Sequence, residues 1–372
     1  MKVPFVDIGR LHGPLRQQLL TAFARVLDSG AYVQGAEVAA FEAEFGRQYG
    51  ESGPAPHAIA VNSGTAALHL ALEAAGIGPG DTVITVANTF IATAEAITLA
   101  GATPVFADIE EGGFNLDPAD AERRITPRTR AIIAVHLYGQ LAAMSQLAEV
   151  CHRNNLLLIE DACQAHGAML DGRTAGTIGD IGCLSFYPTK NVGTVGEGGM
   201  VLTPSAKVAG RVRSLRDHGQ GRRHEHLVQG YNYRMPELQA AALRVLAPHL
   251  DAWNAARANA ARWYAEGLAG LPVDLPAAPG DGSHVYHLYV IRAAERDALQ
   301  VALAEAGIQT AIHYPTPIHL QPAYREYAGG PGSLPRTEAA VAEVLSLPFH
   351  PNIRQDEVDA VCEAVRNFYR DA

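Results

Sequence analysis

Short apolar runs of strand length alternate with helical stretches through the first two thirds of this chain. We expect strands in seven segments: 57–64, 81–87, 102–109, 130–136, 155–161, 183–188 and 198–203. Helices are expected between them over 65–76, 89–101 and 144–154, and Gly76 and Gly101 end the first two. Strands that are apolar on both faces are typical of a mostly parallel sheet covered by helices on each side. The pattern therefore predicts an α/β fold.

The sequence changes character near Pro248, which interrupts a long helical segment over 236–270. Beyond it we expect three further elements, which are a strand over 282–293 and helices over 296–307 and 354–372. A chain of 372 residues is too long for one typical core. We therefore predict a large domain over 1–247 and a smaller α+β domain over 248–372, bridged by the long helix.

The charge and composition exclude several classes of protein. A net charge of -10 argues against general nucleic-acid binding, which needs a basic face. No apolar run approaches the length of a membrane span, and Pro4 and Asp7 interrupt the region where a signal peptide needs an apolar core. The four cysteines form no C-x-x-C pair, which favours free thiols over a metal site or a disulfide framework. We expect a soluble, cytoplasmic protein without a metal, a nucleic-acid partner or a membrane partner.

The segment "NSGT" at 62–65 lies between a predicted strand and a predicted helix. The amide groups of a first helical turn are free, and the helix dipole favours an anion there. Gly64 lets the backbone approach a ligand closely, and Ser185 could add a hydroxyl donor. The segment is thus a candidate phosphate site. An ordinary helix cap by Ser63 or Thr65 also explains these residues, and for this segment considered alone it is the preferred interpretation.

Two further residues follow predicted strands and carry chemistry. Asp161 comes directly after a buried-looking strand, so its carboxylate needs a cationic or proton-donating partner, such as a protonated ring nitrogen, an ion-pair partner or a helix N-terminus. Lys190 closes "SFYPTK" and precedes a glycine-rich stretch; it could attack an aldehyde, or it could be a surface lysine. Ligands collect at the carboxyl ends of strands in such sheets. A phosphate site, an acid for a ring nitrogen and an amine for an aldehyde together match pyridoxal 5'-phosphate.

Seven motifs follow one another along the chain: "NSGTAALHLAL", "NTFIATAEA", "VHLYGQ", "IEDACQAHGA", "GDIGCLSFYPTKNVGTVGEGGMV", "GYNYRMPELQAA" and "HYPTPIHLQPAY". Together they resemble the DegT/DnrJ/EryC1/StrS aminotransferases, and the resemblance runs from about Val3 to the last helix. It implies a pyridoxal-phosphate-dependent sugar aminotransferase with the aspartate-aminotransferase type of fold, called fold type I. This fold has a large domain with a mostly parallel seven-stranded sheet and a smaller α+β C-terminal domain.

The resemblance also implies a role for each matching residue in the coenzyme site. Lys190 is expected to form the Schiff base with the coenzyme and to move the proton between donor and acceptor carbons. Asp161 is expected to pair with the pyridinium nitrogen. The remaining coenzyme contacts are expected from Gln164 near the phenolic oxygen, Phe90 stacked on the ring, and the Gly64 and Thr65 amides with the Ser185 hydroxyl on the phosphate.

Other matching residues concern the neighbouring subunit and the substrate. The resemblance implies that Asn232 reaches the phosphate in the neighbouring subunit, and hence a two-fold homodimer with shared active sites. Tyr187, His313, Tyr314 and His319 are expected to line the sugar pocket, although packing alone would also account for the tyrosine and histidine side chains.

The implied reaction moves an amino group from glutamate or glutamine to a keto sugar linked to a nucleotide. Related sugar 3-dehydratases have histidine where this chain has Lys190, so amino transfer is favoured over dehydration. "NTFIAT" and "HLYGQ" are similar to motifs of enzymes acting on 3-keto-6-deoxy sugars linked to dTDP, which we prefer. "GEGGM" and "GYNYRM" are similar to those of a group that includes enzymes aminating 4-keto nucleotide sugars.

Alternative functions remain open at this point. The chain could aminate a 4-keto nucleotide sugar or a keto-cyclitol. A protein of another class, which holds the coenzyme for regulation without turnover, would keep Lys190 and Asp161, but the intact "HYPTPIH" segment argues against it. A nicotinamide dehydrogenase is excluded, because "GTVGEGG" precedes a predicted strand, whereas a dinucleotide fingerprint follows a strand and opens a helix.

Overall fold

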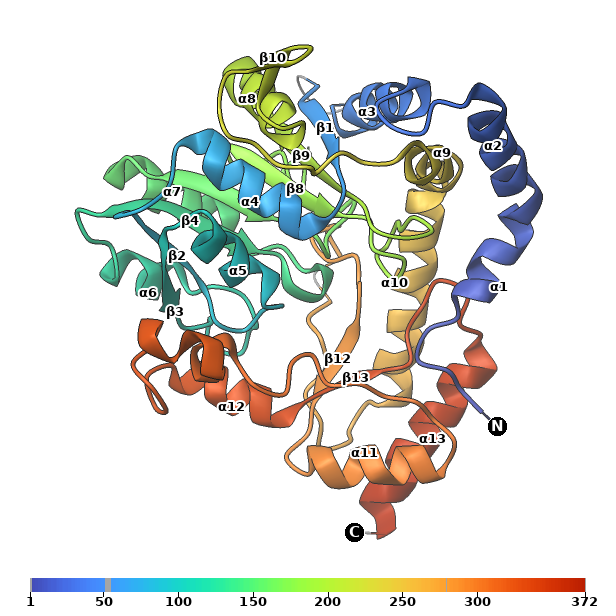
Figure 1. Cartoon of the computed structure of the whole chain (residues 1–372). Coiled ribbons are helices and arrows are strands. Elements are labelled where there is room, and N and C mark those ends of the chain that lie inside the picture. The colour runs from blue at the N-terminus through green and yellow to red at the C-terminus, as the bar shows by residue number, and fades with distance from the viewer. Residues whose placement is uncertain (1, 51–54, 279, 372) are drawn as a thin grey trace.

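The architecture is a seven-stranded sheet with helices on both faces, joined to a smaller α+β unit (Figure 1). A computed structural model describes residues 2–50, 55–278 and 280–371. The strands of the sheet, in spatial order, are β1 (His57–Val61), β9 (Gly199–Thr203), β8 (Ile181–Ser185), β5 (Leu157–Asp161), β4 (Thr129–Val135), β2 (Thr82–Val86) and β3 (Thr103–Ala107). Strand β9 is antiparallel to both of its neighbours, and the other adjacent strands pair in parallel. The predicted α/β fold with a mostly parallel seven-stranded sheet is confirmed.

One face of the sheet packs against three helices. They are α4 (Gly64–Ala75), α5 (Ala92–Leu99) and α8 (Ala206–Arg216). Ile59 and Val61 of β1 point into this layer, where they join Leu68 and Ile97 in one core. Because side chains alternate along a strand, the intervening residues of β1 must face the other layer.

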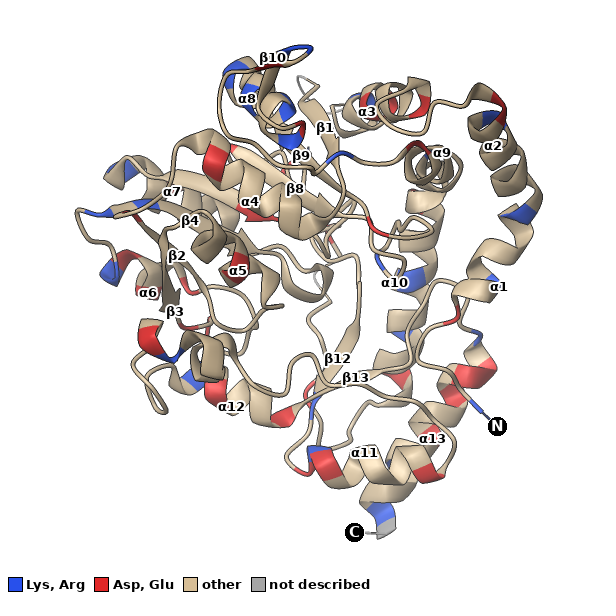
Figure 2. Cartoon of the chain, viewed as in Figure 1, with Lys and Arg blue, Asp and Glu red and all other residues tan. Residues whose placement is uncertain are grey.

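The opposite face is covered by a second helical layer. It contains α3 (Ala36–Tyr49), α6 (Pro118–Arg123), α7 (Met144–Asn154) and α9 (Glu237–Leu246), with α2 (Arg16–Ser29) packed on α9. Ala58 and Ala60 point toward Phe41 and Phe45 of α3 on this side. Figure 2 shows that most charged residues lie on the outer helices and loops, so both faces of the sheet bury apolar side chains.

Local signals set the ends of the helix that opens the candidate site. The Ser63 hydroxyl accepts a hydrogen bond from the Ala66 amide and caps α4. Gly76 ends the helix with a φ of 80°, a left-handed conformation that glycine adopts without strain. The predicted helix over 65–76 is therefore present with nearly the expected bounds. The predicted helix over 89–101 is shorter, because 89–91 form a turn before α5 begins.

The smaller unit contains α10 (Leu250–Gly267), α11 (Arg296–Glu305), α13 (Gln355–Asp371) and the antiparallel pair β12 (Tyr289–Arg292) and β13 (Val344–Leu347). Tyr264, Tyr289 and Phe349 are packed together at the centre of its core. Val3 at the start of the chain bridges to Ile308 and belongs to the same core. The division of the chain at residue 247 stays a prediction.

The interruption expected at Pro248 is present. Residues Ala247–His249 form a 3₁₀ turn between α9 and α10. Leu250 at the start of α10 packs in the core of the large sheet, whereas Tyr264 in the same helix packs in the small unit. Helix α10 therefore connects the two cores, as Figure 1 also shows.

The predicted strand over 282–293 forms in its second half only, as β12. Before it, the Leu141 amide bonds to the Ser283 carbonyl and the Val285 amide bonds to the Gly139 carbonyl. The carbonyls of Tyr286 and His287 accept hydrogen bonds from Arg257 instead of from a neighbouring strand. Alternation of apolar residues could not reveal these partners, because they come from a loop and from α10.

The remaining α-helices and strands of the described residues are short or peripheral. They are α1 (Ile8–His12), α12 (Pro335–Glu343), and the hairpins of β6 (Met169–Leu170) with β7 (Arg173–Thr174) and of β10 (Gln220–Arg222) with β11 (Glu225–His226). Within the described ranges, no helix combines the length and apolar character needed to cross a membrane.

Candidate active site

A cavity of about 750 Å³ lies at the carboxyl ends of β5 and β8, beside the N-terminus of α4. Asp161 is the last residue of β5 and Ser185 the last of β8, so both side chains emerge where the sheet ends. Ten of the twelve residues singled out in the sequence line this cavity: Gly64, Thr65, Phe90, Asp161, Gln164, Ser185, Tyr187, Lys190, His313 and Tyr314. The topology thus brings together segments that are more than a hundred residues apart in the chain.

The start of α4 forms the candidate phosphate cradle. Because the Ser63 hydroxyl accepts from Ala66, the amides of Gly64 and Thr65 keep their hydrogens for a ligand; neither donates to another described residue. A Cβ on Gly64 would lie 2.7 Å from Cβ of Ser185 and 3.0 Å from the Cys163 sulfur. Glycine is therefore required for the helix to come this close to Ser185.

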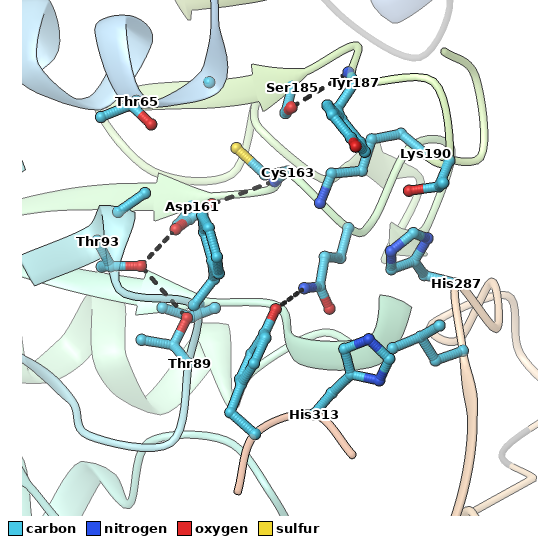
Figure 3. A pocket seen from close by; sticks show the side chains of 18 of the residues that line it. Thr65, Thr89, Thr93, Asp161, Cys163, Ser185, Tyr187, Lys190, His287 and His313 are labelled. Carbon is cyan, nitrogen blue, oxygen red and sulfur yellow. Dashed lines mark hydrogen bonds between the residues drawn. The ribbon is translucent and has the colours of Figure 1, made fainter. Parts of the chain in front are cut away.

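Both carboxylate oxygens of Asp161 have donors. Thr93 Oγ1 donates to Oδ2 over 2.8 Å, and the Cys163 amide donates to Oδ1 over 3.3 Å. The hydroxyl groups of Thr89 and Thr93 are 3.3 Å apart. Because the Thr93 hydroxyl donates its hydrogen to Asp161, it accepts the hydrogen bond from the Thr89 hydroxyl. Figure 3 shows Thr93 of α5 on one side of Asp161 and Cys163 on the other. The carboxylate is buried and fixed in orientation without an arginine or lysine bonded to it among the described residues.

Lys190 is the one Lys or Arg among the residues described around the cavity. Burial lowers the pKa of the Lys190 amine, and the nearby Cys163 and Asp161 oppose that effect in part. A lysine with a lowered pKa loses its proton more readily and becomes a nucleophile. Burial also raises the pKa of the Cys163 thiol well above its usual value, with Asp161 adding to the shift, so this thiol stays protonated.

Gln164 has a fixed amide orientation. Its Oε1 accepts from the Tyr138 amide over 2.7 Å, which leaves Nε2 as a donor directed at the Tyr314 hydroxyl 3.5 Å away. The Tyr314 ring lies 5.7 Å from the Phe90 ring, and the two rings form one side of the cavity. Gln164 therefore presents hydrogen-bond donors, and not an acceptor, to a group bound there.

His313 and Tyr187 lie at different depths. His313 Nδ1 is 2.8 Å from the Ser346 hydroxyl, and its ring stacks on Phe5. Burial, assisted by the Lys190 charge, lowers the pKa of His313 to about 4, so the ring is neutral at pH 7. Tyr187 and Phe90 keep 46% and 54% of their surface exposed, which places these apolar side chains at the mouth of the cavity.

The structure does not bring His319 to the cavity. This ring is buried, and Nε2 lies 3.0 Å from Oε1 of Glu338, which belongs to α12. Asn232 also lies outside the lining residues. Its side-chain oxygen accepts two hydrogen bonds from Arg234, and its backbone carbonyl accepts one from the side-chain Nδ2 of Asn62 over 3.4 Å. Asn232 is exposed, so it can face a neighbouring molecule.

Several residues that line the cavity were not predicted from the sequence. They include Thr89, Thr93, Cys163, Glu197, His287, Gln309, Phe5 and Phe349. The two threonines lie within the motif "NTFIATAEA", where helical spacing of 89 and 93 could have suggested a shared face. Phe5, Gln309 and Phe349 reach the cavity only through packing of the small unit.

The donors around the cavity fit pyridoxal 5'-phosphate. Unpaired helix amides beside a serine hydroxyl suit a phosphate, and an anchored carboxylate suits a protonated ring nitrogen. An amine with a lowered pKa suits an aldehyde, and a fixed amide donor suits a phenolate oxygen. No described trio of His, Cys, Asp or Glu is arranged to hold a metal ion.

Comparison with known proteins places these features in context. The chain matches the DegT/DnrJ/EryC1/StrS aminotransferase family over residues 15–366. It is 46% identical to a Streptomyces venezuelae protein, dTDP-3-amino-3,4,6-trideoxy-alpha-D-glucose transaminase, over 99% of this chain and 96% of that protein.

Two solved structures extend the comparison to the fold. S. venezuelae DesV in complex with a ketimine intermediate has a TM-score of 0.95 and 45% identity, covering 99% of this chain and 98% of that one. Bacillus subtilis NtdA with bound cofactor PMP has a TM-score of 0.91 and 33% identity, covering 99% of this chain and 85% of that one.

Proposed function

Because the chain belongs to the DegT/DnrJ/EryC1/StrS aminotransferase family, we propose that it moves an amino group from an amino acid to a keto sugar linked to a nucleotide, with pyridoxal 5'-phosphate as coenzyme. One observation carries the proposal. Lys190, Asp161 and the free amides of α4 line the same cavity, although they come from three separate segments. Glutamate and glutamine are the expected donors, and the expected cytoplasmic location stays a prediction.

The keto position and the nucleotide are part of the proposal. The S. venezuelae relative is named for a dTDP-linked 3-amino sugar, and it matches this chain over nearly its full length. This likeness favours a dTDP-3-keto-6-deoxyhexose over a 4-keto nucleotide sugar or a keto-cyclitol. The cavity supports a neutral sugar ring, because Tyr187, Tyr314 and a neutral His313 offer hydrogen-bonding groups without adding a charge.

The coenzyme, when bound, supplies an aldehyde that combines with amines and a ring that withdraws electrons from them. In this reaction Asp161 would keep the ring nitrogen protonated, and Thr93 would keep Asp161 in place. The amides of Gly64 and Thr65 would bind the phosphate. Lys190 Nζ would take the proton from the α-carbon of the donor and deliver a proton to the sugar carbon in the second half-reaction.

We also propose a two-fold homodimer in which Asn232 completes the phosphate site of the partner. The exposure of Asn232, and of the apolar side chains Phe90 and Tyr187 at the cavity mouth, supports a covering molecule there. An Asn232→Ala chain mixed with a Lys190→Ala chain should regain activity, because one site of each mixed dimer contains both native residues. If subunit exchange is verified and activity stays absent, each subunit holds a self-contained site.

The function is tested by running the reaction backwards. The coenzyme-loaded enzyme is mixed with dTDP-linked 3-amino and 4-amino sugars, UDP-linked amino sugars and an aminocyclitol, and absorbance reports conversion of the coenzyme from aldehyde to amine form. The proposal expects conversion with a dTDP-3-amino sugar. Conversion with the aminocyclitol alone would establish the cyclitol alternative. No conversion with any compound, despite bound coenzyme, would favour the regulatory alternative.

A further inference from the structure

Glu197 lines the cavity, and none of the roles assigned above involves it. It is one of two carboxylates among the described lining residues, and the other, Asp161, has a donor on each oxygen. The Glu197 side chain is exposed and forms no hydrogen bond or ion pair with any described residue. This carboxylate therefore offers acceptor oxygens to the cavity that the chain itself does not use.

The backbone around Glu197 is fixed, although its side chain is free. The Phe186 amide donates to the Gly198 carbonyl over 2.8 Å, and the Thr194 amide donates to the Phe186 carbonyl over 2.7 Å. The Thr194 hydroxyl also donates to the Gln239 carbonyl of α9 over 3.0 Å. Hydrogen bonds on both sides of Glu197 thus give this residue a defined place on the cavity wall.

Gly199 brings this segment to the candidate phosphate cradle. In the sheet, Gly199 lies opposite Ser185 of β8 and opposite Val61 of β1. A Cβ on Gly199 would lie 2.2 Å from the Ser63 carbonyl oxygen, so a residue with a side chain could not pack this closely against the start of α4. Glu197 precedes Gly199 by two residues, so its negative charge belongs to the part of the cavity beside the cradle.

The charge of Glu197 limits which part of the substrates can contact it. The diphosphate of a nucleotide sugar and the carboxylates of the amino-acid donor are anions, and like charges placed together are unfavourable. The base is separated from the reacting carbon by the ribose, the diphosphate and the sugar ring, whereas the reacting carbon must approach Lys190 in the same cavity. The sugar hydroxyls are neutral donors, and a hydroxyl forms a short, strong hydrogen bond with a carboxylate.

We propose that Glu197 accepts a hydrogen bond from a sugar hydroxyl next to the aminated carbon and thereby selects keto sugars that keep this hydroxyl. The inference rests on the proposed function, because it assigns a contact to the sugar of that reaction. Tyr187 and Tyr314 can donate as well as accept, whereas a carboxylate only accepts. The ketone oxygen therefore cannot bond to Glu197, and the contact determines which edge of the sugar faces this wall.

The test uses the reverse half-reaction and three sugars. They are dTDP-3-amino-3,6-dideoxyglucose and its two analogues that lack either the 2-hydroxyl or the 4-hydroxyl. Coenzyme-loaded full-length chain is mixed with each sugar, and stopped-flow absorbance gives the maximal rate of conversion to the amine form and the apparent dissociation constant. We expect the ratio of rate to dissociation constant to fall by about 10–100-fold when the contacting hydroxyl is absent.

Variants at Glu197 connect this loss to the carboxylate. Glu197→Ala should lower the ratio by about 10–100-fold for the parent sugar, but by less than about threefold for the analogue without the contacting hydroxyl. Glu197→Gln keeps an acceptor oxygen and should recover part of the ratio for the parent sugar. Glu305→Ala is the matched control, because Glu305 is exposed at the end of α11 and does not line the cavity.

The possible results separate the inference from the proposed function. An equal effect of Glu197→Ala on all three sugars, or no effect on any of them, would overturn the inference and leave the proposed function standing. Equal ratios for the three sugars in the native chain would overturn it without any variant. If the native, coenzyme-loaded chain converts none of the sugars, the proposed 3-keto substrate is refuted, and the inference fails with it.

Discussion

Thr93 of helix α5 donates a 2.8 Å hydrogen bond to Oδ2 of Asp161 at the end of strand β5. This bond joins a helix to a strand that is not next to it in sequence, and it holds the carboxylate group in one orientation. Hydrogen bonds to charged groups contribute about 1.5–3 kcal/mol. The orientation of Asp161 in the cavity therefore depends on Thr93, a residue that has no need to contact the ring nitrogen of the coenzyme.

Replacing Thr93 by valine keeps the shape of the side chain and removes the donor. We expect Thr93→Val to lower kcat/KM by roughly 10–100-fold and to weaken coenzyme binding, because Asp161 loses a stabilising donor. Thr98→Val in the same helix is the control, since the Thr98 hydroxyl bonds to helix carbonyls of Ala94 and Glu95. If the two variants have equal kcat/KM, the function of Asp161 does not depend on the hydroxyl group of Thr93.

A methyl group on Gly64 should close the phosphate cradle. The added Cβ would overlap Ser185, so Gly64→Ala should destabilise the chain by roughly 1–3 kcal/mol and abolish tight coenzyme binding. Gly210→Ala in α8 serves for comparison, because no atom lies within 4 Å of its added Cβ. Coenzyme titration by fluorescence and urea unfolding measure the two effects. Normal coenzyme affinity in Gly64→Ala would place the phosphate elsewhere.

Borohydride should attach the coenzyme to one lysine. Reduction of the carbon–nitrogen double bond, followed by peptide mapping, should label the peptide with Lys190 and leave Lys2 and Lys207 unlabelled. Lys190→Arg should prevent labelling and lower turnover by at least 10²–10⁴-fold, the usual contribution of a positioned acid or base. A label on Lys2 or Lys207 in the native chain would refute the assignment.

Acid should destabilise the chain through its buried histidines. His284 Nδ1 accepts a hydrogen bond from the Tyr286 amide, and burial lowers the pKa of His284 to about 4. The unfolded chain, with a histidine pKa near 6.5, binds the proton first, so stability falls as pH falls from about 6.5 to about 4.

His284→Asn isolates this contribution, because the asparagine oxygen can accept from the same amide without titrating. Between pH 7 and pH 5 the native chain should lose roughly 1–2 kcal/mol more unfolding free energy than the variant, measured by urea at constant protein concentration. Parallel losses in the two chains would show that His284 is already charged in the folded state, or that other groups determine the pH dependence.

The sequence predicted the parts of the site that local rules determine. Asp161 was expected at the end of a buried strand, and Gly64 and Ser185 beside other strand ends, so their convergence followed from the rule that ligands collect at the carboxyl ends of strands. The strand that carries Ser185 was expected over 183–188, but it ends at Ser185 itself. The resemblance added Phe90 and Gln164, which no spacing would have singled out. His319 was expected in the sugar pocket, but it is buried against Glu338, because the turn at Ile318–Leu320 directs it toward α12.

The rest of the site depends on contacts between distant segments. His287 obtains its orientation from Asn191 and Asn254, and the segment before β12 obtains its hydrogen bonds from Arg257. In the sequence, each of these residues taken alone is indistinguishable from an ordinary residue of a surface loop or a helix. They contact one another only because the small unit packs against the end of the sheet. The sequence alone does not show this packing.

The position of β1 at the edge of the sheet has a consequence for synthesis on the ribosome. This first strand has β9 as its neighbour in the sheet, and β9 ends at Thr203. The stretch that leads into Gly64 must therefore wait for more than half of the chain to be translated before it can dock. Until then β1 has no neighbouring strand with which to form hydrogen bonds in the sheet, and the residues that lead into Gly64 are not yet held beside Ser185.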